Sequence, residues 1–97
     1  MPRKARRVES ALLAKGFRRI DSKHRKFFYV TTLGSETPIY TLLSQGGNRD
    51  IEDGLLSRMA RQCSLSRREF MTLIDCSLSQ EEYESLLVER GAIDPSH

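Results

Sequence analysis

The chain has 97 residues, of which 38% are hydrophobic and 30% charged, and its formal net charge is +3. This length suits one small domain with one core, and the composition is typical of a soluble globular chain rather than a disordered one. No apolar run approaches the roughly 20 residues that cross a membrane, and no secretory signal follows the basic N-terminus, so we expect a cytoplasmic protein with no membrane partner.

Charge is distributed unevenly along the chain. Residues 1–26 contain ten Lys or Arg against Glu9 and Asp21, a net charge of +8, whereas the remainder contains six basic and eleven acidic groups, a net charge of −5. A cationic end attracts phosphates over about a Debye length, and an acidic end repels them. The pattern therefore favours a polyanionic partner at the N-terminal end, with a solvated basic arm as the alternative.

The first half of the chain predicts one helix and three strands. Apolar residues at helical spacing from Ala5 to Leu12 predict a helix over residues 5–15, ended by Gly16. The segments "FRRID", "HRKFFYVT" and "TPIYTLLS" are rich in aromatic and β-branched residues and are separated by turn signals. We expect them to form an antiparallel meander.

Alternation along the strands predicts how their side chains are shared between the two faces of the sheet. Phe27 and Tyr29 point to one face of the middle strand, and Phe28 and Val30 point to the other. Pro38 cannot donate to a central ladder, so it belongs near the start of the third strand or at an edge. Such a sheet is covered on both faces or uses one face for a partner.

The loop "SQGGNRD" precedes the next predicted helix, which begins with Asp50 as N-cap and runs to about residue 63. Neither cysteine, Cys63 or Cys76, has partners at zinc-site spacing, and we interpret both as buried thiols. The sequence indicates no metal site and no cofactor. One side of the helix is predicted to be apolar, and it comprises Ile51, Leu55, Met59, Ala60 and Cys63.

A helix-start signature occurs twice in the C-terminal third, as "LSRREF" at 65–70 and "LSQEEY" at 78–83. In each, a serine and a glutamate three residues later form a capping box. They predict helices over 66–75 and 79–90. The predicted architecture is α+β, an α-β-β-β-α domain like the double-stranded-RNA-binding fold, with a three-stranded antiparallel sheet and additional short C-terminal helices.

The strings "LLAKGF", "HRKF" and "RDIEDGLLSRMARQCSLSRREF", in this order and spacing, resemble the HicA family of toxin-antitoxin proteins over about residues 5–88. The resemblance implies a single HicA-like domain over residues 1–97, with a core at 5–63, extra helices at 64–91 and a loose tail at 92–97. It also implies an RNA-binding toxin that cleaves mRNA without metal, and a cognate antitoxin protein as partner. The position that matches the family's functional histidine is His24, although the chain has Ser22 where the family has glycine.

Chemistry at His24 fits this expectation. RNA is cut when a base removes the proton of a 2′-hydroxyl that then attacks the neighbouring phosphorus. Cationic neighbours favour the neutral imidazole that acts as base, and they bind phosphates. We therefore predict His24 as the catalytic residue of an endoribonuclease. The predicted RNA-binding residues are Arg6, Arg7, Arg18, Arg19, Lys23, Arg25 and Lys26.

Other interpretations remain open. His24 has no second acid-base group nearby in the sequence, so it also fits an exposed residue of a noncatalytic RNA-binding module of the same fold. Aromatic residues of the strands, Phe27, Phe28, Tyr29 and Tyr40, fit either the core or the stacking of unpaired bases. The helices around residues 51–74 also fit a helix-turn-helix DNA-binding protein, with Arg67 and Arg68 at the start of its second helix. A purely structural or protein-interaction role is a fourth reading.

Overall fold

The structure, a computed structural model, describes residues 3–21, 25–43, 49–75 and 77–94. Within these residues the protein is α+β, with a three-stranded antiparallel sheet, four helices and a short two-stranded ladder. The elements in chain order are β1 (Arg3–Lys4), α1 (Ala5–Ala14), β2 (Phe17–Asp21), β3 (Arg25–Val30), β4 (Glu36–Leu43), β5 (Asp50–Ile51), α2 (Asp53–Gln62), α3 (Arg67–Ile74) and α4 (Gln80–Glu89).

The three-stranded sheet is the predicted meander, in the order β2-β3-β4. Pro38 is the third residue of β4, which is an edge strand, so its prediction is confirmed. The register between β3 and β4 shifts between Phe28 and Val30, where the Thr37 hydroxyl donates to the Tyr29 carbonyl at 2.8 Å. The side chain thus satisfies a backbone acceptor where the ladder is irregular.

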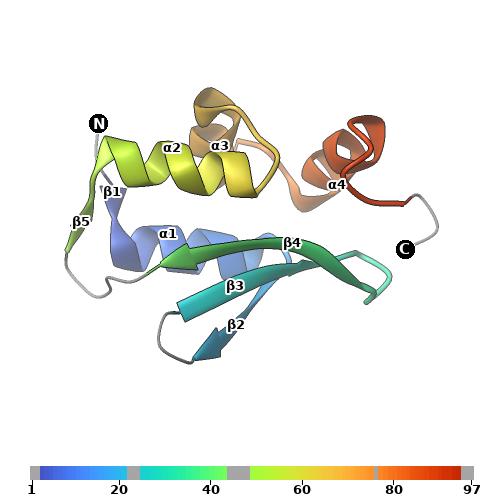
Figure 1. Ribbon diagram of the computed structural model, residues 1–97, viewed down its shortest axis with the longest axis horizontal. Helices are drawn as coiled ribbons and strands as arrows, with labels where there is room; N and C mark the ends of the chain where they lie inside the picture. The colour runs from blue at the N-terminus through green and yellow to red at the C-terminus, as the bar shows by residue number, and fades with distance from the viewer. Residues whose placement is uncertain (1–2, 22–24, 44–48, 76, 95–97) are drawn as a thin grey trace.

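Helices cover one face of this sheet, and no helix lies beneath β2 and β3 in Figure 1. The residues that alternate toward the helices are buried, among them Phe17, Phe27, Tyr29 and Leu43. The alternation predicted for Phe27 and Tyr29 is therefore confirmed. Because the helices bury only one face, the side chains between these positions point away from the core.

The helix α1 packs on the sheet through Ala5, Val8, Ala11 and Leu12, which recur at the predicted helical spacing. It ends one residue before the prediction. Gly16 follows with a φ of +98°, and its carbonyl accepts from the Val30 amide at 3.0 Å. The left-handed conformation turns the chain directly from helix into β2.

The predicted N-cap at Asp50 is wrong. Asp50 belongs to β5, where it pairs with Lys4 of β1, and its carboxylate lies 3.0 Å from the Lys4 ammonium. Glu52 takes the N-cap position of α2 without a side-chain hydrogen bond. A ladder of two residues per strand is too short to produce a periodic pattern in the sequence. The sequence therefore gives no sign that Asp50 belongs to a strand rather than to the helix start. The buried leucine of α2 is likewise Leu56 rather than Leu55.

Both predicted capping boxes are present, at Ser66 with Glu69 and at Ser79 with Glu82. They start α3 and α4 within one residue of the expected positions. Between α2 and α3, Ser64 takes a φ of +62°, and the Leu65 amide donates to the Ala60 carbonyl at 2.9 Å. Such bonds satisfy the last carbonyls of α2.

The helix α4 takes part in the central core. Tyr83 lies in a ring cluster with Phe17 and Tyr29, at centroid distances of 5.8 and 5.1 Å. Its hydroxyl donates to the Cys63 carbonyl at 2.9 Å. The ring therefore joins α4, the sheet and the end of α2.

Cys63 is a buried free thiol, as expected, and burial raises its pKa to about 12. Cys76 lies outside the described residues. None of the helices described is both long and apolar enough to pass through a bilayer.

Candidate nucleic-acid interface

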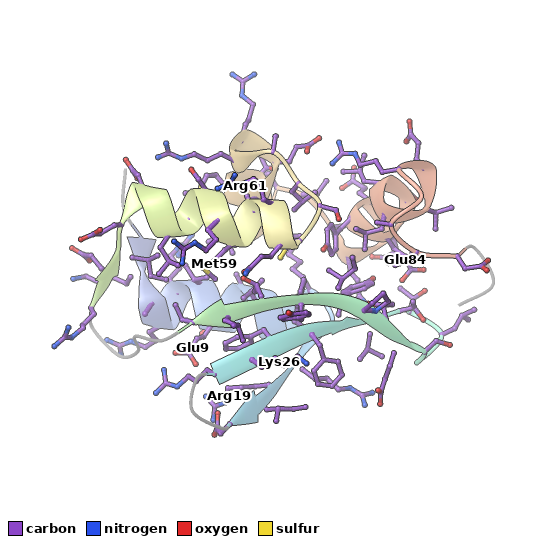
Figure 2. All side chains as sticks on the ribbon, in the orientation of Figure 1. Glu9, Arg19, Lys26, Met59, Arg61 and Glu84 are labelled. Atoms are coloured by element: carbon purple, nitrogen blue, oxygen red, sulfur yellow. The ribbon has the colours of Figure 1, made fainter. Side chains whose placement is uncertain are left out.

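The uncovered side of the sheet, here called the open face, is built by alternate residues of β2, β3 and β4. Its apolar members include Ile20, Tyr40 and Leu42, whose exposed fractions are 50%, 43% and 36%. The cation Lys26 of β3 belongs to the same surface and is labelled in Figure 2. The open face consists of Arg18, Ile20, Lys26, Phe28, Tyr40 and Leu42.

The strand register arranges these six side chains in two rows across the sheet. Ile20, Lys26 and Leu42 form one row. Arg18, Phe28 and Tyr40 form the next row, so that Phe28 lies between a guanidinium and a phenol. Directly opposite residues of neighbouring strands have Cβ atoms about 5 Å apart, close enough for their side chains to act together.

Lys26 links the two rows. Its ammonium lies 4.5 Å from the centroid of the Tyr40 ring, a cation-π contact. The Lys26 ammonium therefore occupies one face of the Tyr40 ring. Among the described residues, neither Lys26 nor Arg18 forms an ion pair with a carboxylate.

A shallow hollow of about 330 Å³ lies along this surface. Its walls combine the aromatic side chains of Phe28 and Tyr40 with the side chain of Glu36. Glu36 is opposite Val30, at the far end of β3 from Lys26. Lys26 and Glu36 therefore lie toward opposite ends of β3, whereas Arg18 pairs with Phe28 between them. The remaining lining residues are Ile20, Lys26, Thr37 and Pro38.

Two of the predicted RNA-binding arginines, Arg19 and Arg25, lie on the helix side of the sheet. Both reach Glu9 of α1, at 3.2 Å and 2.9 Å, and Arg19 also lies 3.2 Å from Asp21. Figure 2 shows Glu9 and Arg19 next to each other at one end of the sheet. With a side-chain exposure of only 13%, Glu9 holds both guanidinium groups. The four charges of this cluster sum to zero, which weakens its attraction for phosphate.

The helix α1 carries the two earliest predicted residues, Arg6 and Arg7, both exposed. Arg7 points to α3, where its guanidinium lies 3.7 Å from the Asp75 carboxylate. The structure therefore brings Arg18 and Lys26 together but separates them from Arg19 and Arg25 and from the helix pair. His24 and Lys23 lie outside the described residues.

A second group of cations lies on the helical layer, where Figure 2 labels Arg61. Arg58 and Arg61 of α2 and Arg68 of α3 are exposed and, within the described ranges, have no ion-pair partner. Arg67 pairs with Asp53 at 2.7 Å. These positions belong to the helices that the sequence also matched to a helix-turn-helix.

The acidic C-terminal part is used to attach α4 to the sheet. The Glu84 carboxylate accepts from the Tyr29 hydroxyl at 2.7 Å and from the Thr32 amide at 2.8 Å. Burial, followed by the bond to Glu84, raises the pKa of Tyr29 above its ordinary range. Sequence reasoning missed this contact, because Tyr29 and Glu84 are 55 positions apart and no local pattern connects them.

Base stacking is excluded for two of the four strand aromatics. Phe27 and Tyr29 are fully buried in the core, whereas Phe28 and Tyr40 are on the open face. Ile20 and Leu42 were not singled out from the sequence, although their strand alternation with buried neighbours was the signal that could have found them.

Comparisons with known proteins place no further constraint on this surface. No family model, no curated protein and no solved structure matches the chain. The resemblance to the HicA family therefore stays a prediction from the sequence motifs.

Proposed function

We propose that the protein binds RNA through the open face, as a HicA-like protein with a double-stranded-RNA-binding-like fold. The observation that carries the proposal is the position of Arg18 and Lys26. These two predicted RNA-binding residues share one surface, have no carboxylate partner among the residues that the structure describes, and lie beside the half-buried Phe28 and the exposed Tyr40. Cations in this state attract phosphates without first breaking an ion pair.

Cleavage of mRNA is the second part of the proposal. His24 immediately precedes β3 in the sequence, two positions before Lys26. We assign it the role of general base toward a 2′-hydroxyl. The same sequence resemblance implies an antitoxin protein that restrains the toxin. The alternative is a noncatalytic RNA-binding module that uses the same cations.

The binding proposal predicts a surface-specific salt dependence. The double variant Arg18→Gln, Lys26→Gln should bind RNA more weakly, and the slope of log affinity against log salt should fall by about 0.7 for each lost phosphate contact. The measurement is fluorescence anisotropy with a labelled RNA over a series of salt concentrations. The matched control is Arg58→Gln, Arg61→Gln, which removes the same charge from α2 and should leave binding nearly unchanged.

Equal losses in the two double variants would mean that binding follows net charge rather than the open face. Absence of complex with any RNA at low salt would remove the function altogether.

The catalytic proposal predicts that His24→Ala abolishes RNA cleavage and retains RNA binding. His97→Ala is the control, since it removes the chain's other histidine. Cleavage is measured on gels with purified protein and mRNA in the presence of a chelator. If the unsubstituted protein does not cut RNA while binding it, the noncatalytic alternative is correct. Expression with and without the neighbouring open reading frame, scored for growth arrest, tests for the antitoxin.

A helix-turn-helix function has one observation in its favour, the exposed arginines of α2 and α3 described above. It predicts the reverse result in the same experiment. Duplex DNA would then be preferred to RNA, and Arg58→Gln, Arg61→Gln would lose binding while the open-face variant keeps it.

A further inference from the structure

We infer that the open face is a stacking platform for unpaired bases, on which Phe28 and Tyr40 receive the bases of a single RNA strand. This inference rests on the proposed RNA-binding function and specifies its ligand as unpaired RNA. The evidence for stacking is the position of the two rings and the hollow beside them, whereas the evidence for RNA binding is the position of Arg18 and Lys26.

The first step is that these rings reach the surface, with Phe28 half-buried and Tyr40 exposed, while the neighbouring rings do not. Phe27 and Tyr29 alternate with Phe28 along β3, and both are completely buried. The fold thus buries two aromatic rings in its core and leaves Phe28 and Tyr40 on the open face, next to Ile20 and Leu42. A contiguous apolar surface of this kind marks a binding site more often than a single exposed residue does.

The second step is the chemistry of the ligand. Every base has an apolar π-face and is joined through its sugar to a phosphate. The two rows of the open face supply aromatic rings for the base and cations for the phosphate. Phe28 is flanked by Arg18 across the ladder to β2, and Tyr40 is covered by Lys26. When a base stacks on Tyr40 it takes the place of the Lys26 ammonium, which is then available to a phosphate.

The third step concerns strandedness. In a duplex the π-faces are already stacked on one another, so only phosphates and groove edges remain for a protein. The rings of Phe28 and Tyr40 have no partner in such a ligand. An unpaired strand can place its bases on the rings and in the adjoining hollow, and its phosphates then meet the cations of the two rows. The phosphates are therefore expected on the side of Arg18 and Lys26.

The test compares three RNA ligands in anisotropy titrations at one salt concentration. They are a single strand of uniform sequence about eight nucleotides long, its abasic counterpart and a duplex of equal length. We expect the single strand to bind at least about tenfold more tightly than the abasic strand, because stacking is worth about 1–3 kcal/mol per base. The duplex should also bind more weakly.

Variants locate the effect. Phe28→Leu and Tyr40→Leu keep an apolar side chain and remove the ring, and each should lower affinity for the single strand by about five- to tenfold while leaving the abasic strand unaffected. Tyr40→Phe keeps the ring and should restore the affinity that Tyr40→Leu loses. Leu33→Ala removes the most exposed large hydrophobic side chain among the described residues, which lies outside the strands, and should have no effect. Circular dichroism of each variant checks that it is folded.

Three results would overturn the inference. These are equal affinity for the abasic strand, preference for the duplex, and self-association of the protein that Phe28→Leu or Tyr40→Leu disrupts. In the first two cases a loss of binding in Arg18→Gln, Lys26→Gln would still support the proposed function. Failure to bind any of the three ligands would refute the proposed function itself.

Discussion

At the scale of single residues, the turn at Gly16 has no room for a side chain. A Cβ there would overlap the side-chain amide of Gln80 and lie 3.0 Å from Cε1 of Tyr29, in addition to the cost of a φ of +98°. We expect Gly16→Ala to lower the free energy of unfolding by about 2 kcal/mol. Urea unfolding measures the change.

Gly54 supplies the matched control. It lies in α2, and a Cβ there meets nothing within 4 Å. Gly54→Ala should therefore raise the free energy of unfolding by up to about 1 kcal/mol, because alanine has the higher helix propensity. Destabilisation of equal size in both variants would contradict the conformation described at Gly16.

The buried phenols predict a loss of stability at alkaline pH. Burial raises the pKa of both Tyr29 and Tyr83 above the ordinary value, so the folded state favours their neutral forms. Their contribution is complete below about pH 10, the ordinary tyrosine pKa, and is lost as pH rises above it. In the variant Tyr40→Phe, which retains only these two tyrosines, tyrosinate absorbance should appear only as the protein unfolds.

Tyrosinate that forms in folded Tyr40→Phe, with the circular dichroism unchanged, would show that a phenol is accessible. Tyr83→Phe is the useful comparison. It removes one of the two groups together with the hydrogen bond to the Cys63 carbonyl, at a cost of about 1 kcal/mol near neutral pH.

At the scale of elements, the start of α3 is tied to the end of α4. Glu69 closes the capping box with Ser66 and also accepts from the Arg90 guanidinium at 2.9 Å. The bond to Arg90 and the bond to the Ser66 amide lower the pKa of Glu69 to about 2. The link joins two helices that have separate start signals.

This link predicts a loss of stability in acid. Because the folded-state pKa lies below the unfolded value, the contribution is present above about pH 4.3 and is lost as pH falls toward 2. Glu69→Gln should therefore show a smaller decline between those values in urea unfolding followed over pH. Glu82→Gln is the matched control, since Glu82 closes the other capping box and, within the described part of the chain, accepts no hydrogen bond from an arginine. If both variants behave like the unsubstituted protein, the Glu69 carboxylate is not coupled to folding.

At the scale of the whole molecule, local signals predicted the elements well and their assembly only in part. Helical spacing, turn residues and capping boxes are local, so they placed α1, α3, α4 and the meander within one or two residues. The β1–β5 ladder and the Tyr29–Glu84 bond join distant segments and have no local signature. For that reason Asp50 was assigned to the wrong element.

The predicted interface was limited in the same way. The sequence shows that Arg18, Arg19, Arg25 and Lys26 are neighbours in a basic segment, and strand alternation divides them between two faces. It does not show that Glu9 neutralises the pair on the helix side. Only the assembled sheet distinguishes cations held by carboxylates from those open to a ligand.

The ring cluster of Phe17, Tyr29 and Tyr83 sets a minimum length for a truncated form of the protein that still folds. A truncated protein that stopped after α3 would lack Tyr83. Phe17 and Tyr29 would then face water, and the Cys63 carbonyl at the end of α2 would lose its hydrogen bond from the Tyr83 hydroxyl. A minimal fragment for binding studies must therefore extend through Ile93, whose side chain closes the same core.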